Sequence, residues 1–112
     1  MATNANPPHA SRTLFFGDAN QSAAADALLA RSENFVSMEL ASATTAKVSF
    51  TANSNALAVD TATFTFSGSF SDACNAFADI LNRGGDRHTV VADQKRGIYA
   101  YPFSGTVTVT EG

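Results

Sequence analysis

Residues Thr61 to Gly85 read TATFTFSGSFSDACNAFADILNRGG, and within this stretch the spacing of apolar positions changes abruptly. Phe64 and Phe66 alternate with threonines, which predicts a strand that buries one face and leaves a threonine face opposite. From Ser71 onward the apolar positions follow the spacing of a helix, at Ala73, Phe77, Ile80 and Leu81. The stretch therefore predicts a helix packed on a sheet.

Both ends of this predicted helix carry boundary signals. Ser71 is expected to cap the first turn, and Asp72 lies where the helix dipole favours an acidic side chain. Gly84 and Gly85 favour the left-handed backbone that commonly ends a helix. These signals agree with the apolar spacing between them.

Strands are expected in most of the remaining chain. Alternation predicts them at 12–17, 35–40, 47–51, 61–66, 88–93, 97–103 and 106–110, with Leu57 and Val59 able to begin a further one. Segments 35–40 and 47–51 form either a hairpin, which we prefer, or one long bent strand. Segments 88–93 and 97–103 are expected to pair about a turn at 94–97.

A second helix is expected over residues 21–32. The run AAADALLAR has high helix propensity, and Asp18, Asn20 and Ser22 offer oxygens for the N-cap. The predicted fold class is therefore α+β: a mostly antiparallel sheet of about five to seven strands with two short helices packed on it.

Length and composition indicate one globular domain. The chain has 112 residues, 45% of them hydrophobic and nine of them phenylalanine, so it lacks the composition of a disordered protein. The domain is expected to span 12–112. Residues 1–11 are polar and contain Pro7 and Pro8, which predicts an extended arm that either contacts another subunit or lies along its own domain.

The charge content is low for an isolated soluble domain. Charged residues make up 15% of the chain, against about one quarter in typical domains. Low charge favours a subunit whose surface is covered by its neighbours. The alternatives are a compositional bias and an extracellular habitat. The net charge of -3 argues against wrapping of nucleic acid, although a local basic patch is compatible with it.

No catalytic, cofactor or metal motif is recognisable in the sequence. A single cysteine, Cys74, excludes an intrachain disulfide framework and a multi-cysteine zinc site, and His9 and His88 are not spaced as metal ligands. Cys74, His88 and either Asp86 or Asp93 could be written as a thiol triad, but a lone cysteine without a family motif is usually structural. We expect no enzyme, no cofactor and no metal.

No segment resembles a cleaved signal peptide or a membrane span. The first residues lack an apolar core of signal-peptide length, and no apolar run approaches the roughly 18 residues that a membrane span requires. No contact with a membrane is expected. The expected location is the virion if the protein is viral, and otherwise the cytoplasm.

The one local charge feature is a basic cluster that follows the predicted helix. Four of the seven basic residues lie within fourteen positions together with one histidine, and two tyrosines follow on the adjacent predicted strand. Cations interleaved with aromatic rings can hold single-stranded nucleic acid. Alternatively, Asp79, Asp86 and Asp93 neutralise the cluster locally, or an acidic patch on a neighbouring subunit does. The candidate partner-binding residues are Arg83, Arg87, His88, Lys95, Arg96, Tyr99 and Tyr101.

Three functional classes are compatible with these observations. We prefer a non-enzymatic structural subunit of a self-assembling particle, such as a capsid, capsid-decoration or tail component of a virion, with copies of itself and other subunits as partners. The second class is a small module that binds nucleic acid or an anionic ligand through the basic hairpin 83–101. The third is an enzyme in which Cys74 and His88 would act.

Overall fold

The computed structural model describes residues 12–52, 58–82 and 88–111 of the chain. Within these residues the chain forms eight strands and one α-helix, α1 (Phe70–Asn82). The strands are β1 (Thr13–Gly17), β2 (Ala27–Arg31), β3 (Phe35–Leu40), β4 (Thr45–Thr51), β5 (Val59–Phe66), β6 (His88–Asp93), β7 (Ile98–Tyr99) and β8 (Phe103–Thr110). The prediction of one mixed, mostly sheet domain is confirmed, whereas the expected numbers of strands and helices were wrong. The predicted arm, 1–11, lies outside the described residues.

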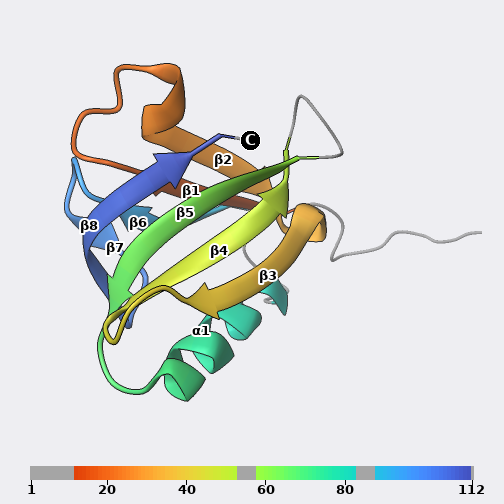
Figure 1. Ribbon diagram of the computed structural model, residues 1–112, viewed down its shortest axis with the longest axis vertical. Helices are drawn as coiled ribbons and strands as arrows, with labels where there is room; N and C mark the ends of the chain where they lie inside the picture. Colours follow the sequence, from red (N-terminus) through yellow and green to blue (C-terminus); the bar gives the residue numbers. More distant parts are fainter. Residues whose placement is uncertain (1–11, 53–57, 83–87, 112) are drawn as a thin grey trace, which may run out of the picture.

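The strands form two four-stranded sheets, ordered β2-β1-β6-β7 and β3-β4-β5-β8. Figure 1 shows the second sheet in front of the first, with α1 near β3. Strands β1 and β6 pair in parallel, and the other described pairings are antiparallel. The parallel pair joins segments that are far apart in sequence, so it needs the long connection through the other sheet and α1.

Phenylalanines from both sheets and from α1 meet in the core. The ring centroid of Phe16 in β1 lies 5.7 Å from that of Phe50, 5.8 Å from that of Phe64 and 6.5 Å from that of Phe77. Phe50 and Phe64 belong to the second sheet, and Phe77 belongs to α1. The core therefore lies between the sheets, and the helix covers one side of it.

The segment from β5 to α1 follows the predicted alternation closely. Phe64 and Phe66 are buried, and Thr61, Thr63 and Thr65 are half-buried on the other face. Ala73, Phe77 and Ile80 are the buried residues of α1.

The start of α1 lies slightly before the predicted position. The helix begins at Phe70, and Ser69 caps it, because the Ser69 hydroxyl accepts a hydrogen bond from the Asp72 backbone N–H at 3.0 Å. The cap predicted at Ser71 was therefore wrong by two residues. Gly84 and Gly85, the predicted stop, lie outside the described residues.

The helix predicted over 21–32 is wrong. Residues Ala27–Arg31 form β2, which pairs antiparallel with β1 and buries Leu28 and Ala30 between exposed neighbours. Only two short 3-10 turns, η1 (Ala24–Asp26) and η2 (Ser32–Asn34), flank the strand. Helix propensity is a weak preference, and pairing with β1 satisfies the same backbone groups while burying alternate side chains.

The loop before β2 is held by a carboxylate. The backbone N–H groups of Ser22 and Ala23 donate to Asp26 Oδ2 at 3.0 and 2.9 Å. These backbone hydrogen bonds, that of Ser22 first, lower the pKa of Asp26 from its ordinary value. Asp26, which was not among the predicted cap residues, therefore organises a loop that leads into a strand.

The predicted hairpins form, with one of them shorter than expected. β3 and β4 pair antiparallel about residues 41–44, which confirms the preferred hairpin. β6 pairs with β7, but β7 contains only Ile98 and Tyr99. Pro102 has no N–H for a ladder, and after it β8 begins at Phe103 and joins the other sheet beside β5.

Candidate functional site

The outer face of the sheet β3-β4-β5-β8 is almost free of charge. On β5, Thr63 lies between Lys47 of β4 and Thr108 of β8, and Thr61 lies between Ser49 and Thr110 in the same way. We call this surface the threonine face, and it comprises Ser37, Glu39, Thr45, Lys47, Ser49, Thr61, Thr63, Thr65, Ser104, Thr108 and Thr110. Its two charged members pair with each other, Lys47 Nζ lying 4.0 Å from Glu39 Oε1.

Strand β3 borders the threonine face as the edge of its sheet. Among the described strands it pairs only with β4, so its other side presents backbone groups that are available for a further strand. Val36 is 54% exposed and Leu40 is 52% exposed on this edge. Leu40 lies opposite the core residue Ala46, so it belongs to the inner face of the sheet and not to the threonine face.

The predicted partner-binding residues are distributed over several positions. Arg83 and Arg87 lie outside the described residues. His88 begins β6, and its Nδ1 lies 2.8 Å from Thr13 Oγ1. Lys95 is exposed in the turn between β6 and β7.

The two tyrosines have different surroundings. The Tyr99 hydroxyl donates to the Gly105 carbonyl at 2.7 Å, so it is used within the fold. Tyr101 follows β7 and is 88% exposed. The structure therefore leaves one of the two predicted aromatic side chains open to a partner.

His88 and Arg96 line a common pocket of about 200 Å³, together with Phe15, Gln21, Val90 and Asp93. The Asp93 carboxylate is buried at this pocket, and its Oδ2 lies 3.8 Å from Arg96 Nε. Asp93 Oδ1 accepts a hydrogen bond from Gln21 Nε2 at 2.6 Å. The prediction that an aspartate neutralises part of the basic cluster is confirmed for Asp93 and Arg96.

Gln21 was not identified from the sequence. Its φ is 51°, in the left-handed region, and its backbone N–H donates to Asp18 Oδ1 at 3.0 Å. An aspartate such as Asp18 commonly organises a turn by accepting hydrogen bonds from the backbone two or three residues later. In the sequence, Asp18 was interpreted as a helix cap instead. Gln21 joins this loop to β6 through Asp93.

The thiol triad receives no support from the geometry. Cys74 is a free, half-buried thiol in α1, and it does not line the pocket that His88 and Arg96 share. Across residues 12–52, 58–82 and 88–111 no group of three or more His, Cys, Asp and Glu side chains could hold a metal ion. Cys74 lies in the first turns of α1, next to Ala73, which is buried in the core as Phe77 is.

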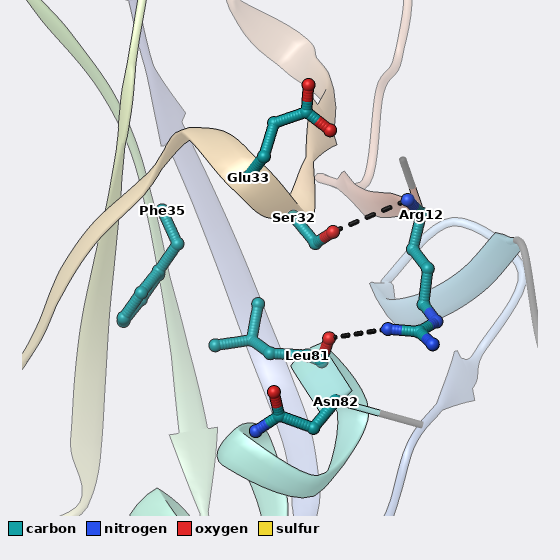
Figure 2. Close-up of a pocket in the computed structure, with 6 residues that line it drawn as sticks. All are labelled: Arg12, Ser32, Glu33, Phe35, Leu81 and Asn82. Atoms are coloured by element: carbon teal, nitrogen blue, oxygen red, sulfur yellow. Dashed lines mark hydrogen bonds between the residues drawn. The ribbon is translucent and has the colours of Figure 1, made fainter. Parts of the chain in front are cut away.

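A second and larger cleft lies between η2 and the end of α1. It has a volume of about 450 Å³ and is lined by Arg12, Ser32, Glu33, Phe35, Leu81 and Asn82, which Figure 2 shows around the opening. We call it the Arg12 cleft. Arg12 is 3% exposed, and its Nη1 donates to the Leu81 carbonyl at 2.8 Å. Its Nη2 has no hydrogen-bond partner in the described part of the chain.

The backbone of Arg12 is also fixed at this cleft. Its N–H donates to Ser32 Oγ at 3.4 Å, and its carbonyl accepts from the Ser32 N–H at 2.8 Å. The sequence predicted a strand that begins at Arg12, and no site at this residue. A single arginine before an apolar run does not indicate a binding site. The cleft forms only where Arg12, the residues around η2 and the end of α1 meet in the fold.

Comparisons with protein-family models, with curated proteins and with solved structures find no match for this chain. Among the described residues no helix is long and apolar enough to span a membrane.

Proposed function

We propose that the protein is a non-enzymatic structural subunit that assembles with copies of itself and with other subunits into a particle, specifically a virion component such as a capsid, capsid-decoration or tail protein. The proposal rests on the threonine face. The proposed location of the protein is the virion, or the cytoplasm if the particle is not viral.

The threonine face is suited to contact with another subunit. Threonine has strand propensity and no charge to desolvate, so a second sheet can cover it without burying an unpaired ion. Lys47 and Glu39 already compensate each other on this surface. The unpaired edge of β3 adds backbone donors and acceptors beside it. A second copy of the chain is therefore the occupant we propose for this face.

We expect Thr108→Lys to weaken self-association at least about tenfold in dissociation constant. Thr108 is exposed on β8 and lies opposite Thr63, so a lysine there introduces an unpaired charge into the proposed contact. Sedimentation velocity of the full chain at several concentrations measures the association.

Asn75→Lys is the matched control, because Asn75 is exposed on α1 and lies outside the threonine face. This variant should associate as the unmodified protein does. A strictly monomeric unmodified protein at the highest concentration, or equal association by both variants, would contradict the proposal.

A small module that binds nucleic acid or an anionic ligand is the second candidate, and the pocket shared by His88 and Arg96 favours it. We expect affinity for a fluorescent single-stranded oligonucleotide to fall steeply with salt and to fall further in Arg96→Ala. Arg31→Ala is the control, because Arg31 is exposed on β2 and does not line this pocket. Weak binding that is independent of salt would exclude this function.

A further inference from the structure

We infer that the edge of β2 that faces away from β1 is a second contact between copies of the chain, in which two β2 strands pair antiparallel about a two-fold axis at Leu29. The inference rests on the proposed function, because it concerns how the subunit assembles, but its surface is separate from the threonine face. β2 is the outermost strand of its sheet (Figure 1), and among the described strands it pairs only with β1. A two-fold contact alone closes at a dimer, so a larger particle needs a further, different contact.

The first argument is the direction of the backbone groups of β2. The Ser32 N–H donates to the Arg12 carbonyl at 2.8 Å, and the Asp18 N–H donates to the Asp26 carbonyl at 2.9 Å, at the two ends of the β1–β2 ladder. Hydrogen-bonded pairs alternate with non-hydrogen-bonded pairs in an antiparallel ladder. The even-numbered residues of β2 therefore bond to β1, and the odd-numbered residues direct their N–H and C=O groups toward the outer edge.

The second argument is the symmetry of this outward-facing set. It consists of Ala27, Leu29 and Arg31, which are spaced evenly about Leu29. When two β2 strands pair antiparallel with Leu29 opposite Leu29 of the second copy, Ala27 lies opposite Arg31 on both sides of the axis. Every outward-facing residue then belongs to a hydrogen-bonded pair. Any other register leaves at least one of these residues without an outward-facing residue opposite it, so the strand specifies its own pairing.

The third argument is the fit of the side chains at this axis. Leu29 is 52% exposed and lies beside Phe15 of β1, which in turn lies beside Val90 of β6. Pairing about Leu29 places the two leucines opposite each other, which joins the apolar rows of the two copies into one. Arg31 approaches the other end of the second strand, which directly follows Asp26. No like charges are therefore directly opposite each other.

β3, which also lies at a sheet edge, is less suited to pairing with its own copy. The Ala41 N–H donates to the Thr45 carbonyl at 2.9 Å, so by the same alternation Met38 and Leu40 face outward. A register that pairs these two residues places Glu39 opposite Glu39 of the second copy, and like charges in such a pair are destabilising. We therefore assign the pairing of identical strands to β2.

Charge exchange at residue 29 tests the inference on the full chain. The variants are made in Thr108→Lys, in which the threonine face is blocked, so that only the β2 contact is measured. Leu29→Lys and Leu29→Glu each place like charges at the axis, and each alone should self-associate at least about tenfold more weakly than Thr108→Lys. A 1:1 mixture places opposite charges there and should associate at least about threefold more tightly than either variant alone. Sedimentation velocity at several concentrations measures these affinities.

Ile98→Lys and Ile98→Glu are the matched controls, because Ile98 is an apolar residue, 48% exposed, on β7 of the same sheet. Alone or mixed, they should associate as Thr108→Lys does. A strictly monomeric Thr108→Lys protein, undiminished association of Leu29→Lys, or no recovery in the mixture would overturn the β2 contact. None of these results bears on the threonine face, which the comparison of Thr108→Lys with Asn75→Lys tests separately. A strictly monomeric unmodified protein would overturn both.

Discussion

Phe16→Ala is expected to lower the free energy of unfolding by about 3 to 5 kcal/mol. The Phe16 side chain is 0% exposed and contacts rings from both β4 and β5 as well as Phe77 of α1. Removing it leaves a cavity bordered by three elements, which cannot all move inward at once. Urea denaturation followed by circular dichroism measures the loss.

Phe15→Ala is the matched control for this experiment. Phe15 is the same residue type at the neighbouring position of β1, where it is half-buried on the opposite face of the sheet. Its truncation should cost at most about 1 kcal/mol. Equal losses from the two variants would mean that β1 does not place Phe16 at the centre of the core.

Gly105→Ala should destabilise the protein by about 2 to 4 kcal/mol, for two separate reasons. The φ of Gly105 is 77°, which is a left-handed backbone conformation that residues other than glycine rarely adopt. An added Cβ would also lie 2.6 Å from Thr65 Oγ1 and 2.9 Å from Thr65 Cβ. Both atoms belong to the neighbouring strand β5, so the contact can be relieved only by separating β8 from β5.

Gly97→Ala separates the two causes. Gly97 also has a positive φ, 69°, but an added Cβ would project into open space among the described residues. Only the backbone contribution remains there, and a cost of about 1 to 2 kcal/mol is expected. Thermal and urea denaturation of both variants measure the difference. Equal losses would contradict the close approach of β8 to Thr65.

The candidate sites differ in how far the sequence predicted them. The threonines of β5 follow from simple alternation, because each strand residue faces opposite to its neighbour. Their extension across β4 and β8 depends on register, which the sequence does not specify.

The basic cluster was predicted as a set of nearby positions, and only part of it forms a common site. Arg96 and His88 share a pocket, while the Tyr99 hydroxyl is bound to the backbone of β8. The Arg12 cleft was not predicted at all, because its residues come from three segments that are far apart in the sequence.

Local patterns in the sequence alone determined β5 and α1, and they favoured the β3–β4 hairpin over one long bent strand. Alternating Phe64 and Phe66 can bury one face only in a strand, and the spacing of Ala73, Phe77 and Ile80 can do so only in a helix. In these segments the local preference and the tertiary packing favour the same backbone conformation, so the local pattern was sufficient.

The tertiary structure decided the rest, namely the strand at Ala27–Arg31, the parallel pairing of β1 with β6 and the passage of β8 into the second sheet. In the run AAADALLAR the helix preference amounts to a few tenths of a kcal/mol per residue. Pairing with β1 instead buries Leu28 and Ala30 and satisfies the ladder of backbone groups. The stabilisation from this pairing and burial is larger than the helix preference. It comes from residues distant in sequence, so a local sequence pattern cannot predict it.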